Sequence, residues 1–164
     1  MTTTILYRGW ALLFGFELWA LASPLAAADR FTMVFNGEAV KDNQTGLIWE
    51  REPDREFDVW SASISRCETK TVGGQTGWRA PTVEELKTLV DPSQKDPALL
   101  PGHPFVNIKS AIYWTATPSP TDEIVAWQVS FFSGEAVTDQ KVRHAPRLVR
   151  TRRAAEVIGA LPPV

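Results

Sequence analysis

Basic side chains near the end of the chain are the residues whose type and spacing could bind a charged ligand. Residues 139–153 hold six basic residues against one acidic residue, a net charge of +5, whereas residues 29–138 hold 16 acidic and 10 basic residues, a net charge of −6. Arginine binds sulfate or carboxylate through two parallel N–H donors. The segment is therefore predicted to contact an anion, although a run of like charges is more often a solvated surface. The candidate contacts are Lys141, Arg143, Arg147, Arg152 and Arg153.

Nucleophilic catalysis by Cys67, the only cysteine of the chain, is a second chemistry to consider. A cysteine nucleophile needs a base within reach, and His103 and His144 are the two histidines. Cys67, however, shares one face of a predicted helix with Trp60 and Ile64, a spacing that points the thiol into the core. We therefore expect a buried free thiol, no intramolecular disulfide and no enzyme activity.

Metal-dependent chemistry is not indicated by the sequence. Glu52-Pro53-Asp54 resembles the sugar-binding tripeptide of calcium-dependent lectins, in which oxygen ligands hold the cation and the sugar hydroxyls. The tripeptide lies before either predicted helix, and no W-N-D partner follows near the end of the chain. No histidine and cysteine spacing predicts zinc, and no glycine-rich phosphate loop or nucleic-acid motif occurs. We expect no metal, no cofactor and no nucleic-acid partner.

Residues 1–28 are predicted to be a secretory signal peptide rather than part of the fold. Arg8 precedes a mostly apolar stretch, Trp10 to Ala22, and Ala26-Ala27-Ala28 forms a small-residue cleavage site. An uncleaved anchor and cleavage after Ala22 are the alternatives, and no later stretch is apolar enough to span a membrane. The expected protein is exported, either periplasmic or extracellular, with no membrane span once the signal is removed.

The rest of the chain is predicted to form one domain over residues 29–153, followed by a poorly ordered tail at 154–164. Turn signals and apolar runs divide the domain into short strands. These strands are expected at Phe31–Phe35, Val40–Lys41, Leu47–Trp49, Ala111–Thr117, Val125–Phe132, Glu135–Thr138 and Arg147–Thr151.

Two helices are predicted beside these strands. The first runs from an Asp58 N-cap to about Thr69. The second begins at Thr82, which can form a reciprocal capping box with Glu85, and runs to about Val90, because the following proline stops it. The fold class is therefore α+β, with two helices packed beside antiparallel strands and long loops.

Several motifs follow one another in an order that is typical of one domain family. They are K-D-N-Q-T-G-L-I-W from Lys41, G-W-R-A-P-T-V-E-E-L from Gly77, Y-W-T-A-T from Tyr113, A-W-Q-V-S-F from Ala126, S-G-E-A-V from Ser133 and R-L-V-R from Arg147. Over roughly residues 31–152 the chain resembles the Lcl C-terminal domain family, which implies a C-type-lectin-like or formylglycine-generating-enzyme-like fold. The tryptophans of these motifs are predicted to be core residues, because large aromatics dominate buried area. They are Trp49, Trp78, Trp114 and Trp127.

The resemblance also bears on individual residues. Family members commonly carry a cysteine in the last motif that can pair with the helix cysteine, and Leu148 stands in its place in this chain. Arg147 and Arg150 match the same motif, so they have a structural alternative. This favours Arg143, Arg152 and Arg153 for ligand contact.

The family is named for the C-terminal domain of a collagen-like adhesin, which implies recognition of sulfated glycans. The predicted function is an exported, non-catalytic recognition module that binds an anionic polysaccharide through its basic C-terminal segment. The alternative is an envelope domain that binds an envelope or host-surface protein and no glycan. The two differ in salt dependence, because contacts between exposed charges are screened by salt and a buried apolar interface is not.

Overall fold

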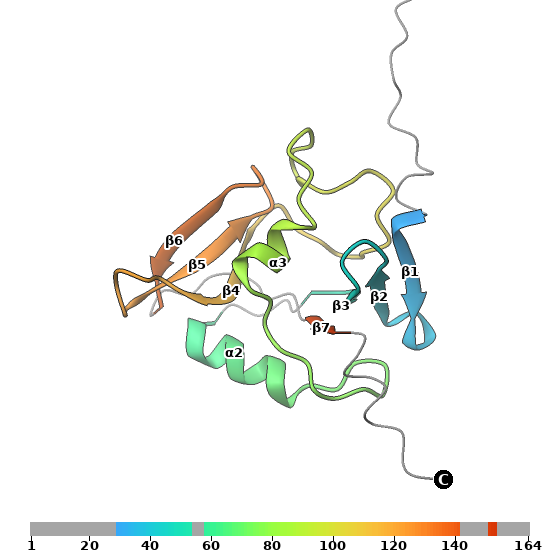
Figure 1. Ribbon diagram of the computed structural model, residues 1–164, viewed down its shortest axis with the longest axis horizontal. Coiled ribbons are helices and arrows are strands. Elements are labelled where there is room, and N and C mark those ends of the chain that lie inside the picture. The colour runs from blue at the N-terminus through green and yellow to red at the C-terminus, as the bar shows by residue number, and fades with distance from the viewer. Residues whose placement is uncertain (1–28, 54–57, 142–150, 154–164) are drawn as a thin grey trace, which may run out of the picture.

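The computed structural model describes residues 29–53, 58–141 and 151–153 (Figure 1). Several sequence predictions lie outside these ranges, namely the signal peptide 1–28, the tail 154–164, Asp54, Arg143, His144, Arg147 and Leu148. Within the described ranges, no helix is long and apolar enough to cross a membrane.

The first sheet brings the two ends of the described chain together. Its four antiparallel strands lie in the order β1-β2-β3-β7. They are β1 (Phe31–Val34), β2 (Ala39–Asp42), β3 (Leu47–Glu50) and β7 (Thr151–Arg153). A 3-10 turn, η1 (Phe35–Gly37), joins β1 to β2. The turn into β3 uses Gly46 at φ +73°, a conformation that glycine adopts without steric cost.

The last strand is placed by long-range pairing. Ile48 of β3 lies opposite Arg152, and Thr151 exchanges backbone hydrogen bonds of 3.1 and 3.0 Å with Arg79. The predicted strand reached Thr151 from Arg147. In the structure β7 starts at Thr151 and continues to Arg153, while 147–150 are outside the described residues.

The second sheet has three antiparallel strands in the order β4-β5-β6. They are β4 (Ile112–Pro118), β5 (Val125–Ser130) and β6 (Ala136–Gln140), each within two residues of its predicted bounds at either end. The register between β4 and β5 shifts between Trp114 and Pro118. Such an irregularity bends the strand and re-aims its side chains.

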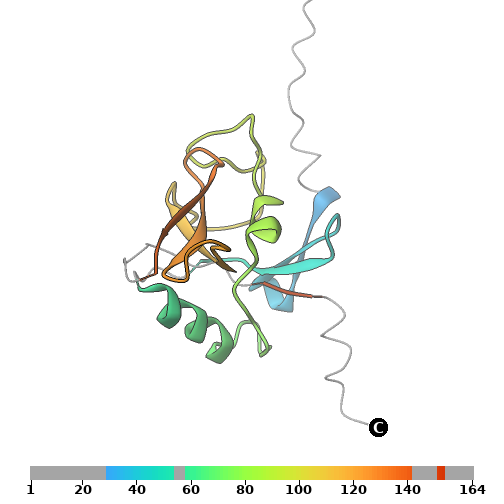
Figure 2. The same cartoon turned by 60° about the vertical axis from the view of Figure 1, so that its left-hand side comes forward.

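Two helices cover opposite faces of the second sheet (Figures 1 and 2). Helix α2 (Trp60–Thr69) packs Cys67 and Ile64 against Trp114. Helix α3 (Val83–Lys87) packs Val83 and Leu86 into the larger cluster with Tyr113 and Val129. The predicted α+β class with two helices beside antiparallel strands is confirmed.

The bounds of both helices differ in detail from the prediction. The predicted Asp58 N-cap is wrong: the N-cap is Val59 without a side-chain bond, because Asp58 accepts from the Val59 N–H at 2.9 Å and pairs with Arg66. Helix α3 ends at Lys87 rather than near Val90. The Leu89 and Val90 N–H groups bond three residues back, so the chain tightens out of α geometry.

The main core lies between the two sheets and holds them together. Trp49 and Val40 of the first sheet, Leu86 of α3, and Tyr113 and Phe131 from the second sheet region belong to one buried cluster. The Tyr113 and Phe131 rings pack with centroids 4.4 Å apart. Helix α3 is therefore held between both sheets, and its outer side forms part of the surface.

Candidate functional site

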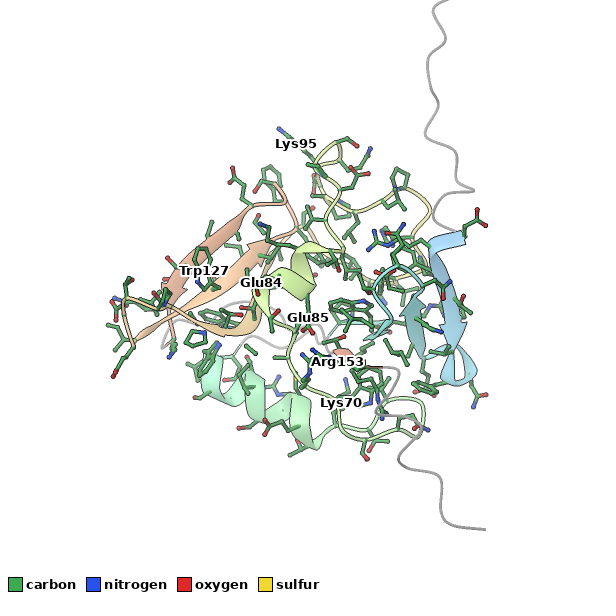
Figure 3. The ribbon with its side chains drawn as sticks, in the orientation of Figure 1. Lys70, Glu84, Glu85, Lys95, Trp127 and Arg153 are labelled. Carbon is green, nitrogen blue, oxygen red and sulfur yellow. The ribbon has the colours of Figure 1, made fainter. Side chains whose placement is uncertain are left out.

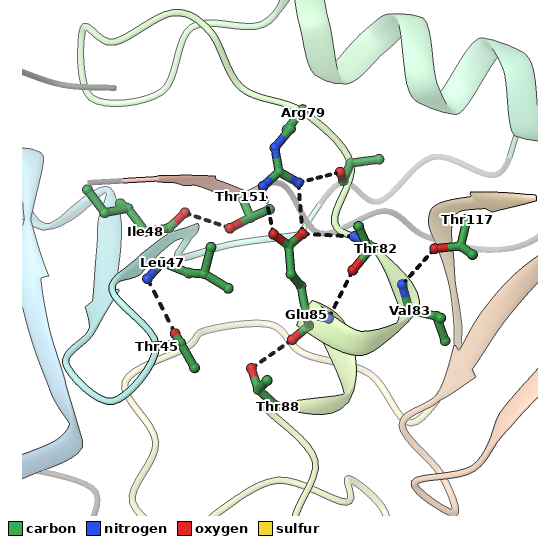
Figure 4. A network of polar contacts seen from close by, with 11 residues as sticks. Thr45, Leu47, Ile48, Arg79, Thr82, Val83, Glu85, Thr88, Thr117 and Thr151 are labelled. Atoms are coloured by element: carbon green, nitrogen blue, oxygen red, sulfur yellow. Dashed lines mark hydrogen bonds and ion pairs between the residues drawn. The ribbon is translucent and has the colours of Figure 1, made fainter. Parts of the chain in front are cut away.

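The start of α3 lies in a network of hydrogen bonds and ion pairs (Figure 4). The Thr82 hydroxyl accepts from the Glu85 N–H at 3.2 Å, and the Glu85 carboxylate accepts from the Thr82 N–H at 2.9 Å, which confirms the predicted capping box. Arg79 donates to both carboxylate oxygens of Glu85 at 2.8 and 2.7 Å. The helix is thereby fixed to the strand-like segment that precedes it.

Charge around Glu85 reinforces this arrangement. The hydrogen bonds from Arg79 hold the pKa of the Glu85 carboxyl below its ordinary value, and the positive charges of Arg79 and Arg153 act in the same direction. The Val83 N–H donates to the Thr117 hydroxyl at 3.0 Å, which ties α3 to β4. Helix α3 thus offers a rigid edge between two hollows of the surface.

The first hollow, which we call the Arg153 hollow, lies between α3 and the first sheet. It has a volume of about 630 Å³. Its lining is Thr45, Gly46, Leu47, Glu84, Glu85, Thr88 and Arg153. Arg153 is exposed at the end of β7 (Figure 3). The hollow therefore combines one guanidinium with two carboxylates.

The second hollow, which we call the Trp127 groove, lies between α3 and the second sheet. It has a volume of about 590 Å³ and shares only Glu84 with the Arg153 hollow. Its lining is Val83, Glu84, Lys87, Thr117, Pro118, Pro120, Trp127 and Ala136. Figure 3 shows Trp127 on β5 across from Glu84 on α3. An aromatic ring, small apolar residues and two charged groups thus meet in one open groove.

The predicted cationic residues are not brought together. Lys141 lies at the end of β6, where its ammonium donates to the Glu123 carbonyl at 2.6 Å and sits 4.6 Å from the centre of the Trp60 ring. Arg152 and Arg153 point to opposite faces of β7, because neighbouring residues of a strand alternate. Arg143 and Arg147 lie outside the described residues.

Arg152 is buried rather than presented to solvent. It is 4% exposed, and its guanidinium lies 5.7 Å from the centre of the Trp78 ring. Within the part of the chain that the structure describes, its Nε and Nη1 atoms have no hydrogen-bond partner. Of Arg152 and Arg153, it is therefore Arg153 that lines a hollow large enough for a ligand.

A scan against protein families matches residues 38–151 to the model of the Lcl C-terminal domain. This chain belongs to the Lcl C-terminal domain family. The match runs from the residue before β2 to the first residue of β7, and it contains both lengths of chain that form the Trp127 groove. No curated protein matches the chain.

In this Lcl C-terminal domain, Cys67 and His103, the histidine that the structure describes, lie in different surroundings. Cys67 is fully buried in the α2 cluster with Trp114 and Ala126. His103 packs against Phe105, which belongs to the main core, and burial lowers the pKa of its imidazole. Among the described residues, no group of three or more His, Cys, Asp and Glu residues could hold a metal ion.

Sequence reasoning missed the role of Trp127. Of the four motif tryptophans predicted to be core, Trp49, Trp78 and Trp114 are at most 1% exposed, whereas Trp127 is only partly buried against the core. A signal was available in the Pro118-Ser119-Pro120 turn. A turn that is rich in proline stays on the surface and places apolar rings beside its neighbouring strand.

Proposed function

We propose that this Lcl C-terminal domain is an exported, non-catalytic recognition module that binds an anionic glycan through residues 139–153. The observation that carries the proposal is that Arg153 is an exposed residue and lines the Arg153 hollow. An exposed arginine beside an open hollow can engage a sulfate or carboxylate with two donors at once. Membership of a family named for an adhesin domain supports a recognition role over an enzymatic one.

The two ends of the basic segment are held firmly by the domain. The Lys141 N–H donates to the Ile124 carbonyl at 2.8 Å, and the Lys141 carbonyl accepts from the Trp60 N–H at 3.0 Å. The other end pairs with β3 and Arg79 through β7. A ligand that bridges these ends would meet cations whose backbone is already ordered, which lowers the entropic cost of binding.

A non-catalytic role is supported by the positions of the groups that could do covalent chemistry. The Cys67 thiol is buried beneath α2, whereas a reactive cysteine is partly exposed in an electropositive site.

The test is binding of the purified chain to heparin and to neutral glycans at NaCl concentrations from about 0.05 to 0.5 M. A variant with Lys141, Arg143 and Arg153 changed to alanine removes three charges of the segment. A matched control changes Lys41, Lys95 and Lys109, which lie elsewhere and remove the same charge. Heparin binding that weakens with salt, is lost in the first variant and survives in the control supports the proposal.

An envelope domain that binds another protein is the second candidate, and two exposed apolar side chains favour it. Ile124 is 60% exposed and Phe132 is 57% exposed, so each offers an apolar contact to a partner protein. If heparin does not bind even at low salt, this candidate replaces the glycan proposal. The result expected for this candidate is binding of a partner protein that persists at high salt and is lost when Ile124 and Phe132 are changed.

Export and a C-type-lectin-like relationship complete the proposal. The signal-like pattern of residues 1–28 supports export to the periplasm or the cell exterior. Two small antiparallel sheets with two helices and the long loop between α3 and β4 are compatible with a lectin-like arrangement. Mass spectrometry of the secreted product, with a mature end near Asp29, tests the export part.

A further inference from the structure

The lining of the Trp127 groove includes none of the described residues of the basic segment. We propose that this groove binds one neutral pyranose ring of a glycan, stacked on the indole of Trp127. The proposal extends the glycan recognition proposed above from charge to the sugar ring itself, and it rests on that function. It concerns different residues, so the two can fail separately.

The groove lies beside α3, which is short. A helix of five residues is only about 7.5 Å long, and it buries Val129 and Tyr113, whereas Trp127 and Ala136 are only partly buried. Trp127 lies opposite Thr138 of β6. Ala136, Pro118 and Pro120 flank the ring with short or rigid side chains that leave space above it.

The rim of the groove carries polar groups that are not engaged elsewhere. Within the described ranges, the side chains of Glu84 and Lys87 have neither a hydrogen-bond nor an ion-pair partner, although they stand one turn apart on α3. The Thr117 hydroxyl accepts from the Val83 N–H and keeps its own proton to donate. A carboxylate, an ammonium and a hydroxyl thus face one small space.

This combination matches the chemistry of a pyranose. One face of a pyranose ring presents C–H groups, which the electron-rich face of an indole attracts, and its edge carries hydroxyls that both donate and accept. Glu84 can accept from two hydroxyls, and Lys87 can donate to a third. A groove of about 590 Å³ is within the usual size range of small-ligand sites.

The charge of the rim indicates that the ring is neutral. Glu84 and Lys87 cancel each other, and a sulfated ring would bring its anion close to the Glu84 carboxylate, with no arginine among the described lining residues to bind the sulfate through two donors. An apolar peptide is disfavoured for another reason, because it would desolvate both charged groups without pairing them. A polyproline peptide usually docks on several aromatic rings, and among the described residues of the lining Trp127 is the only aromatic one.

The experiment titrates the purified chain with methyl glycosides and neutral hexasaccharides of glucose, galactose, mannose and N-acetylglucosamine in about 0.5 M NaCl, where surface charge contacts are screened. Binding is followed by the NMR signals of the tryptophan indole N–H groups. The Trp127→Phe variant, which keeps an aromatic ring in place, identifies the Trp127 signal. The other variants are Trp127→Ala and Glu84→Gln, and the matched controls are Phe132→Ala, an exposed aromatic outside the groove, and Glu68→Gln, an exposed glutamate on α2.

We expect at least one of these sugars to move the Trp127 signal at millimolar concentration, with affinity reduced about tenfold or more by Trp127→Ala and severalfold by Glu84→Gln. Both controls should bind as the unchanged protein does. The isosteric Glu84→Gln change keeps the test valid if Trp127→Ala unfolds. The proposal is overturned if no sugar binds at about 10 mM, if binding does not respond to Glu84→Gln, or if decaproline, in place of a sugar, moves the Trp127 signal.

A result in which neutral sugars bind but heparin does not would remove the anionic-glycan proposal and leave this one standing. The opposite result, salt-sensitive heparin binding that depends on Lys141, Arg143 and Arg153 with no effect of Trp127, would remove this one and leave the other.

Discussion

At the scale of single residues, Trp127 differs from the other motif tryptophans because of what covers it. Trp114 packs with residues of α2 and Trp49 lies in the main core, whereas Trp127 is only partly buried and lines the open Trp127 groove beside α3. All four tryptophans lie in motifs of the family, and nothing in their immediate neighbours separates a fully buried ring from a partly buried one. The difference in exposure is therefore a property of the neighbouring element and cannot be read from the local sequence.

The exposure of Arg152 and Arg153 is likewise decided by a neighbouring element rather than by the local sequence. The two residues are adjacent in sequence, yet one lies 4% exposed over Trp78 and the other is exposed at a hollow. Strand geometry makes them alternate, and pairing with β3 decides which of them faces inward. The sequence predicted the basic segment, but the side that each guanidinium faces depends on a partner about a hundred residues away.

Gly134 is predicted to be the more sensitive of two glycines with similar backbone angles. A Cβ on Gly134 would lie 2.7 Å from Val90 Cγ1 at φ +80°, whereas a Cβ on Gly74 at φ +73° would meet nothing within 4 Å. Gly134→Ala should therefore lower the free energy of unfolding by about 2–4 kcal/mol, from backbone strain plus steric overlap, and Gly74→Ala by about 1 kcal/mol from strain alone. Urea denaturation of both variants measures this. Equal losses would mean that Val90 moves aside freely.

At the scale of elements, the start of α3 was predictable and the start of α2 was not. The T-x-x-E spacing of the capping box is a local pattern, so Thr82 and Glu85 predict the start of the helix from the sequence. Aspartate is a common N-cap residue, but the Asp58 carboxylate pairs with Arg66 and accepts a hydrogen bond from the N–H of the next residue. The sequence did not show that Arg66 and the Val59 N–H would bind the Asp58 carboxylate, because neither group belongs to the capping pattern.

The Arg79–Glu85 pair should make the stability of α3 depend on pH. The folded pKa of Glu85 lies below its ordinary value of 4.5, chiefly because of the hydrogen bonds from Arg79. The stabilisation is therefore complete above this ordinary pKa, and it is lost as the pH falls through the lower folded value. Glu85→Gln should destabilise the protein by about 1–2 kcal/mol at pH 7, and this difference should shrink progressively as the pH drops below about 4.

The neighbouring residue provides the control for this prediction. Glu84 is exposed on the same helix and has no hydrogen-bond partner among the described residues, so Glu84→Gln should change the free energy of unfolding by less than about 0.5 kcal/mol at every pH. Thermal or urea unfolding of the three proteins at several pH values gives the comparison. If Glu85→Gln lowers the free energy of unfolding by the same amount at pH 7 and at pH 3, the charge of Glu85 does not contribute to stability.

At the scale of the whole molecule, folding redistributes a charge pattern that is simple along the chain. Residues 139–153 carry a net charge of +5 in sequence, but Lys141 lies at the second sheet beside Trp60 and Arg153 lies at the first sheet beside α3. The α+β class and most strands could be predicted, because hydrophobic period and turn residues are local signals. The two hollows could not, because each joins elements that are distant in sequence.

The main core predicts that the two sheets unfold as one unit. Leu47 of β3 is 6% exposed and belongs to the same buried cluster as Tyr113 of β4 and Val129 of β5, with α3 packed between them. Leu47→Ala should cost about 2–4 kcal/mol, because it leaves a cavity at this junction. Since the junction serves both sheets, amide hydrogen exchange should quicken by the same factor for the most protected N–H groups of β2 and of β5.

Phe132→Ala, an exposed change on the surface, should leave both rates unchanged. If exchange quickens in β2 while β5 stays protected, the sheets are separate cooperative units, and the hollows beside α3 would then lie at a boundary that can open.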